Sequence, residues 1–231
     1  MKTGIIGAME LEVATLKAAM KNVEITTKAG MDFFEGKLEE KDVVVVQCGI
    51  GKVNAGMCVQ ILCDIFGVTN IINTGVAGSL NSKLDIGDIL VSDEAVQHDM
   101  DVSALGYAPG QIPGVDVLGF KADGEMAEMA VRACRNVNKD INVLRGRVVS
   151  GDQFISSAEV KDRLIDRFNG DCAEMEGAAV AQASYLNGVS FIVVRAISDK
   201  ADGSAQMDYP TFEKKAAEHC ASMIQEYMRI M

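Results

Sequence analysis

The run VSFIVV, residues 189–194, is the feature that most constrains the fold. It is made almost entirely of β-branched and aromatic side chains and shows no apolar/polar alternation, which is typical of a strand buried on both faces of a parallel sheet. Ligands of open α/β sheets bind beyond the carboxyl ends of the strands. The polar residues that follow the run, Arg195, Ser198 and Asp199, are therefore candidates for a functional site.

A helix is predicted directly before this strand, from Met175 to Leu186, because apolar residues recur there at helical spacing. Glu174 and Glu176 stand at its start. Acidic side chains at a helix N-terminus interact favourably with the helix dipole whether or not they have another role, so a structural role is an open alternative for both. Asp199 is likewise compatible with a turn or a helix cap.

The composition favours one α/β domain over residues 1–231. The hydrophobic fraction is 48%, and no Pro-rich, Ser-rich or low-complexity linker divides the chain. No apolar stretch approaches the ~20 residues that a membrane helix requires, so no membrane association is expected. The N-terminus, MKTGIIGAMELEV, lacks the apolar region and cleavage site of a signal peptide. We therefore expect a cytoplasmic location.

Charge and ligand-type residues exclude several functions. The net charge is −11, whereas nucleic-acid binding needs a basic surface, so a small molecule is the expected partner. The six cysteines form no CxxC pair and lie mostly in apolar runs, as expected of core thiols in a reducing compartment. With only His98 and His219 as histidines, a metal site has few ligands available, and none is predicted.

The first candidate catalytic residue is Glu12. Residues 3–6 predict a strand that ends at Gly7, and the helix that follows has Glu12 on its apolar side, together with Val13 and Leu16. Burial raises the pKa of a carboxyl group, which suits a general base. A partly exposed helix glutamate is the equally weighted alternative.

Two glycine-rich segments come next. Strands are predicted at 33–38 and 42–48, and the GIGKVNAG segment after them matches a dinucleotide fingerprint only partly, since Asn54 occupies the third glycine position. A helix is predicted from Val53 to Phe66, and then a strand that ends in a second glycine-rich turn, Gly75 to Ser79. Backbone N–H groups of such a turn, which contains Val76, Ala77 and Gly78, can bind an anion, a sugar or a base.

The remaining elements place more polar groups at strand ends. We predict strands at 86–96 and 143–151, helices at 123–136 and 211–228, and an irregular segment from 97 to 119, which is long enough to indicate a functional loop. Asp152, Gln153, Phe154 and Ile155 follow the second of these strands. Gathered together, the strand ends predict one pocket with three acids, an arginine and an aromatic platform.

These motifs together resemble a known family. The chain is similar to the 5′-methylthioadenosine/S-adenosylhomocysteine nucleosidases of the purine nucleoside phosphorylase superfamily over nearly its whole length. The motifs that carry the resemblance occur in the family's order: GIIGAMELEV, GIGKV, INTGVAG, GDILVSDEAVQHDMDV, GYAPGQIPG, VSGDQFI, EMEGAAVA and VVRAISDKAD.

The resemblance implies a fold, an assembly and a reaction. The fold is a three-layer α/β/α, nucleoside phosphorylase-like arrangement with a nine- to ten-stranded mixed, largely parallel twisted sheet, in a homodimer. The reaction is hydrolysis of the N-glycosidic bond of adenine thionucleosides, without a cofactor, in nucleoside catabolism and methionine salvage. It releases adenine and a thioribose.

The resemblance also implies roles for individual residues. Glu12 corresponds to the base that activates water, and Asp199 to the acid that protonates adenine N7. Glu176 corresponds to the carboxylate that holds the ribose hydroxyls, with Met175 under the sugar. Further implied contacts are Phe154 and Ile155 with adenine, Arg195 and Ser198 as supports of the water and the acid, Met9, Ile50 and Tyr209 around the 5′-alkylthio tail, and Val102, Leu105, Tyr107 and Pro113 from a second subunit.

The reaction's charge distribution agrees with these roles, since cleavage builds positive charge on the ribose and negative charge on the departing base. One position departs from the pattern, because some relatives have a serine where this chain has Val76, which offers no hydroxyl to the attacking water. A phosphate-dependent phosphorylase remains the alternative, with Lys52 and Arg195 as cations. A non-catalytic sensor is disfavoured, because all three acids are present.

Overall fold

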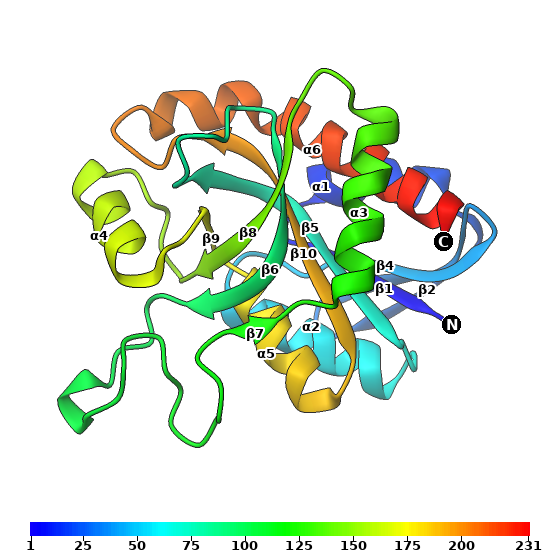
Figure 1. Ribbon diagram of the computed structural model, residues 1–231. Helices are drawn as coiled ribbons and strands as arrows, with labels where there is room; N and C mark the ends of the chain where they lie inside the picture. The colour runs from blue at the N-terminus through cyan, green and yellow to red at the C-terminus, as the bar shows by residue number, and fades with distance from the viewer.

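The computed structural model describes residues 1–231 and contains one ten-stranded mixed sheet with helices on both faces (Figure 1). The strands are β1 (Thr3–Gly7), β2 (Lys21–Lys28), β3 (Met31–Leu38), β4 (Lys41–Gln47), β5 (Asn70–Ser79), β6 (Ile89–Gln97), β7 (Phe120–Lys121), β8 (Val143–Ser150), β9 (Cys172–Glu174) and β10 (Ser190–Asp199). The helices are α1 (Glu10–Ala19), α2 (Lys52–Asp64), α3 (Gly124–Val137), α4 (Ala158–Phe168), α5 (Gly177–Asn187) and α6 (Ala205–Ile230), with a 3₁₀ turn, η1 (Ser103–Leu105).

The run at 189–194 forms the buried parallel strand that its composition predicts. β10 pairs in parallel with β5, and β5, β1 and β4 continue the parallel arrangement. The strand does not end after Val194. It continues to Asp199, so that Arg195, Ser198 and Asp199 lie within the carboxyl-terminal half of the strand rather than beyond it.

Five strands close into a ring at one side of the sheet. β10 pairs with β5 in parallel and with β6 in antiparallel orientation; β6, β8 and β9 follow in parallel, and β9 returns antiparallel to the end of β5. From β5 the sheet extends outward through β1, β4 and β3 to β2, which pairs only with β3. The β2–β3 pairing shifts register between Lys21 and Glu24.

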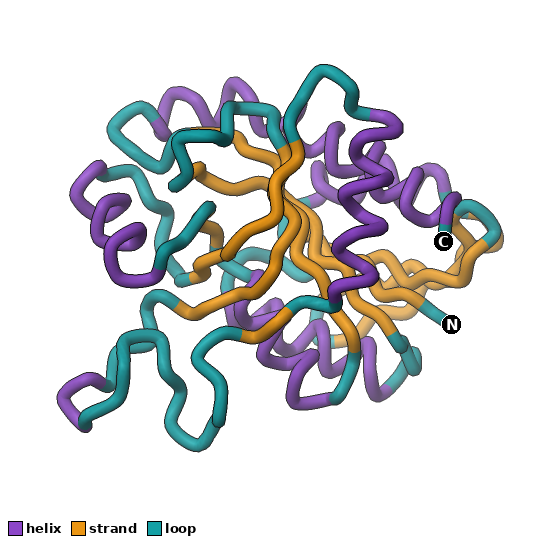
Figure 2. The backbone as a smooth tube through the Cα atoms, viewed as in Figure 1, coloured by secondary structure: helices purple, strands orange, loops and turns teal.

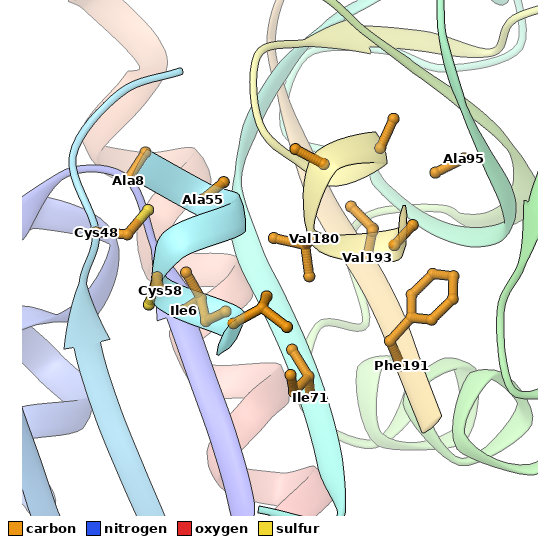
Figure 3. Packing of buried hydrophobic residues seen from close by; sticks show 14 of the residues in the cluster. Ile6, Ala8, Cys48, Ala55, Cys58, Ile71, Ala95, Val180, Phe191 and Val193 are labelled. Atoms are coloured by element: carbon orange, nitrogen blue, oxygen red, sulfur yellow. The ribbon is translucent and has the colours of Figure 1, made fainter. Parts of the chain in front are cut away.

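Two helical layers cover the sheet, as expected for the three-layer arrangement. α1, α3 and α6 supply one core cluster, with Leu16, Ala130 and Met223 packed on one face. α2 and α5 supply the other, and Figure 3 shows Cys58 and Val180 from these helices beside side chains of the strands. No helix of the protein is both long enough and apolar enough to cross a membrane.

The segment predicted to be irregular, 97–119, is irregular from His98 onward and holds only η1, whereas Gln97 is the last residue of β6. Figure 2 shows it projecting away from the body of the protein. Leu105 at its tip is 74% exposed.

Two predictions about local structure are wrong. Gly75 to Ser79 is not a turn but the end of β5. Gly75 and Gly78 keep an extended backbone there and leave room for the carboxylates of Glu12 and Asp199. The last helix starts at Ala205 instead of Thr211 and ends at Ile230 instead of Met228. The short strands β7 and β9, the edge strand β2 and the helix α4 were not predicted.

Candidate active site

A cavity of about 300 Å³ opens where the carboxyl ends of β1, β5 and β10 meet those of β8 and β9, which run the opposite way. Strand closure thus brings together segments that are far apart in the chain. The lining residues are Ala8, Met9, Glu12, Ile50, Val76, Ala77, Gly78, Gln153, Phe154, Ile155, Ala173, Glu174, Met175, Glu176, Ser198, Asp199 and Tyr209.

The cavity contains thirteen of the predicted site residues: Met9, Glu12, Ile50, Val76, Ala77, Gly78, Phe154, Ile155, Met175, Glu176, Ser198, Asp199 and Tyr209. The sequence did not single out Ala8 or Ala173 as site residues. Val102, Leu105, Tyr107 and Pro113 do not line the cavity of their own chain. Leu105 and Tyr107 are exposed on the projecting segment, which is compatible with the expectation that they reach a second subunit.

Glu12 is held by the turn between β1 and α1. Its Oε2 accepts hydrogen bonds from the backbone N–H groups of Ala8 (2.7 Å) and Met9 (2.9 Å), and its Oε1 accepts one from Val76 (3.1 Å). The side chain is buried, and this burial raises its pKa against the opposing effects of Arg195 and the N–H donors. A fixed carboxylate with a raised pKa can take a proton from a water molecule.

Gly75 is required for this arrangement. A Cβ atom at Gly75 would lie 2.5 Å from Glu12 Oε1, a distance that real Cβ contacts do not show. The glycine-rich end of β5 therefore allows a carboxylate to approach the backbone directly.

Asp199 lies at the end of β10, after a register shift between Ile197 and Asp199 in the pairing with β5. Such bulges redirect side chains next to functional sites. Its Oδ1 accepts the Ala201 N–H (2.8 Å) and its Oδ2 the Ser198 hydroxyl (2.9 Å). Burial raises the pKa of Asp199 despite these hydrogen bonds. The carboxyl group therefore keeps a proton to a higher pH than an exposed aspartate does, as a general acid requires.

Glu176 precedes α5 and faces the loop after β4. Its Oε1 accepts the Gly51 N–H at 2.7 Å, which links two segments distant in the chain. Burial, reinforced by the negative charge of Glu174, raises its pKa to about 7. The carboxylate lines the cavity and is available to sugar hydroxyl groups.

Glu174, which lines the cavity, forms a buried ion pair with Arg195, which does not. Arg195 Nη2 also donates to Asn73 Oδ1 (2.5 Å), and Glu174 accepts the Ser150 hydroxyl and the Gly177 N–H (2.7 Å) at the start of α5. Burial disfavours the charged guanidinium, but the neighbouring glutamates outweigh it and raise the pKa of Arg195. Glu174 thus has structural contacts both at the start of α5 and with Arg195.

The rim of the cavity is apolar and aromatic. Phe154 is 50% exposed, and its ring lies edge-to-face with that of Tyr209 at a centroid distance of 5.7 Å. The Tyr209 hydroxyl donates to Met9 Sδ at 3.3 Å, and Ile50 is exposed nearby. This rim offers a flat platform and apolar contacts to a ligand.

Lys52, the second cation considered for phosphate binding, is not free to bind it. Its Nζ pairs with Asp99 Oδ1 at 2.5 Å and donates to Gln97 Oε1 at 2.9 Å. Because Arg195 is likewise paired, neither cation is left without a carboxylate partner. No group of three or more His, Cys, Asp or Glu side chains is placed to hold a metal ion.

Comparison with known proteins agrees with this geometry. The model of the Phosphorylase superfamily matches residues 2–229. The 5′-methylthioadenosine/S-adenosylhomocysteine nucleosidase of Staphylococcus haemolyticus is 41% identical over 229 residues, which cover 99% of both chains. That of Geobacillus kaustophilus is 38% identical, covering 100% of this chain and 98% of its own.

Solved structures give the same result. The Neisseria meningitidis nucleosidase in complex with methylthio-immucillin-A superimposes with a TM-score of 0.96, at 37% identity, covering 100% of this chain and 99% of its own. The futalosine hydrolase of Helicobacter pylori has a TM-score of 0.94 at 33% identity and covers 100% and 98%. The chain therefore belongs to the phosphorylase superfamily and, within it, to the 5′-methylthioadenosine/S-adenosylhomocysteine nucleosidases.

Proposed function

We propose that this chain hydrolyses the N-glycosidic bond of 5′-methylthioadenosine and S-adenosylhomocysteine, releasing adenine and the thioribose. The observation that carries the proposal is the cavity itself, where Glu12, Glu176 and Asp199 converge under an aromatic platform. The family supports it, because the relatives bear this activity in their names.

Each carboxyl group has a separate task in this reaction. Asp199, which burial keeps protonated to a higher pH, donates a proton to adenine N7 and makes the base a better leaving group. Glu12 deprotonates the attacking water. Glu176 holds the ribose hydroxyls and, with the other anions, stabilises positive charge on the sugar in the transition state. Phe154 stacks on the adenine ring.

Water is favoured over phosphate as the nucleophile. A phosphate dianion requires unpaired cations or helix N-termini, whereas Lys52 and Arg195 are each bound to a carboxylate. Buried glutamates line the cavity where the nucleophile would stand and would repel a dianion.

The decisive experiment measures the products. Purified protein is incubated with methylthioadenosine with and without phosphate, and both adenine and the sugar are quantified. We expect free methylthioribose at a rate that phosphate does not change. Recovery of the sugar 1-phosphate would assign a phosphorylase instead, and binding without adenine release would assign a sensor.

The rim contacts support two finer proposals. The apolar side chains around Met9 and Ile50 suit an alkylthio tail, so kcat/KM should be higher for methylthioadenosine than for adenosine; the reverse preference would contradict this. The segment with Val102, Leu105, Tyr107 and Pro113 closes the cavity of a second copy in a homodimer, as its exposed side chains favour. Light scattering that showed an active monomer at assay concentration would contradict the dimer.

We also place the enzyme in the cytoplasm, in methionine salvage. Six unpaired cysteines, five of them buried, fit a reducing compartment. Fractionation of the native cells that recovered the activity outside the cytoplasmic fraction would contradict this.

A further inference from the structure

Three segments meet at Asp99, outside the cavity. Asp99 follows β6, and its Oδ1 pairs with Lys52 Nζ at 2.5 Å while its Oδ2 accepts the Asp152 N–H at 3.0 Å. Lys52 opens α2, and Asp152 lies in the loop after β8. A single carboxylate thus joins two loops that are about a hundred residues apart in the chain.

Asp152 closes the triangle. Its own Oδ1 accepts the Lys52 backbone N–H at 2.8 Å, at the N-terminus of α2. Gly51, with φ of 97°, packs directly against this carboxylate, and a Cβ there would lie 3.0 Å from Asp152 Oδ1. The two loops are therefore connected both through Asp99 and directly.

Each of these loops continues into the cavity. On one side, the Gly51 N–H donates to Glu176 Oε1 at 2.7 Å. On the other, Phe154 follows Asp152 by two residues and forms the aromatic platform. The distance between Glu176, which is proposed to bind the ribose, and Phe154, which is proposed to stack on adenine, therefore depends on how the two loops are connected.

The ion pair is well placed to keep this spacing constant. The side chains of Lys52 and Asp99 are only 19% and 17% exposed. Lys52 Nζ is also held by Gln97 Oε1, and Gln97 Nε2 donates to Gln182 Oε1 on α5 at 2.5 Å. Neither Lys52 nor Asp99 lines the cavity, so neither touches the substrate.

We propose that Asp99 is a positioning residue for the hydrolysis, which acts through Lys52 and Asp152 to hold Glu176 and Phe154 at the separation that the nucleoside requires. The proposal rests on the proposed function for the identity of the substrate. The positioning role of Asp99 can nevertheless be tested by measuring adenine binding, which does not require hydrolysis.

The test compares Asp99→Ala with Asp93→Ala. Asp93 lies on β6, the strand that precedes Asp99, and pairs with Arg145 at 2.5 Å, but it has no connection to the two loops, so its removal is a control for losing an ion pair. Displacing reacting groups by about 1 Å costs about 100-fold in rate. We expect Asp99→Ala to lower kcat/KM by about 10- to 100-fold and to weaken adenine binding, and Asp93→Ala to stay within about twofold of wild type.

A double-mutant cycle separates positioning from general destabilisation. In a Phe154→Leu background, where the platform is already lost, Asp99→Ala should change the adenine dissociation constant by less than about twofold. Asp99→Asn should be intermediate, because its amide oxygen accepts only one of the two hydrogen bonds. All constants are measured well below the unfolding midpoint of each variant, and Lys52→Met replaces Asp99→Ala if the latter does not fold.

Two results would overturn the proposal. One is an equal loss of adenine affinity with and without Phe154, and the other is wild-type adenine binding and wild-type kcat/KM in Asp99→Ala. If wild-type protein instead binds adenine but releases no adenine from methylthioadenosine, the proposed function fails. The double-mutant cycle measured by adenine binding still decides the role of Asp99.

Discussion

Replacing Asp199 with asparagine removes the proton donor while leaving the shape of the cavity intact. The amide oxygen can accept the Ala201 N–H that Asp199 Oδ1 accepts now at 2.8 Å. The amide NH₂ then faces the Ser198 oxygen, 2.9 Å away in the native protein, and the hydroxyl can rotate to accept from it. Both hydrogen bonds are kept in number, so we expect a change in the free energy of unfolding of less than about 1 kcal/mol.

The effect on the rate should be large. Loss of a general acid typically costs about 10²- to 10⁴-fold, which corresponds to about 3 to 5 kcal/mol of activation free energy. Because burial raises the pKa of Asp199, wild-type kcat should also fall as the pH rises through that pKa and the carboxyl loses its proton. The Asp199→Asn variant should lack this decline.

The assay follows adenine release across a pH series and measures the substrate dissociation constant directly, since the slow variant permits equilibrium binding. We expect kcat to collapse and the dissociation constant to change by less than about threefold. If Asp199→Asn keeps more than about a tenth of wild-type kcat, less than the usual effect of a general acid, the acid has been wrongly assigned.

Three further results follow from the same carboxylates. Glu176→Gln should raise the substrate dissociation constant and lower kcat together, because Glu176 acts in both the ground and the transition state; steady-state kinetics with loss of only one parameter would contradict this. Gly75→Ala should lower kcat by about 100-fold, because its Cβ displaces Glu12, whereas Gly56→Ala, with open space around it in α2, should raise stability by about 1 kcal/mol and leave kcat unchanged. The pKa of Glu176 is raised from 4.5 to about 7, so the folded state binds this proton more tightly, and the stability that it contributes at low pH is lost as the pH rises from about 4.5 to about 7. The thermal stability of Glu176→Gln relative to wild type should therefore rise over this range and level off above it, and a constant difference across the whole pH series would contradict the assignment.

The elements that sequence predicts best are those whose residues share one environment along their length. The strands β4 and β10 are buried on both faces and appear as unbroken apolar runs. β2, KNVEITTK, is exposed nearly throughout and so has no such signal. α4 was not predicted either, although its two buried residues, Leu164 and Phe168, are one helical turn apart and so follow a helical pattern.

The features of the candidate site likewise fall into those that the sequence shows and those that only the fold shows. Glu12 could be identified because a carboxylate in an apolar helical stripe is unusual in itself. The partners of Glu174 could not be predicted, because Arg195 and Ser150 come close to it only when β9 and β10 join the ring. Gly75 was interpreted as part of a turn, because sequence shows that a glycine is present but not that a carboxylate needs the space.

The end of the sheet away from the ring has an edge strand, β2, that another molecule could pair with. β10 is paired on both sides, whereas the outer side of β2 has backbone N–H and C=O groups without strand partners. Exposed Val23 and Ile25 on this strand would favour intermolecular β-pairing. The register shift near Lys21 distorts the edge, and the lysine charges at both ends of β2 disfavour stacking of identical edges. The polar residues that make β2 hard to predict from the sequence, its terminal lysines among them, therefore also protect its exposed edge against aggregation.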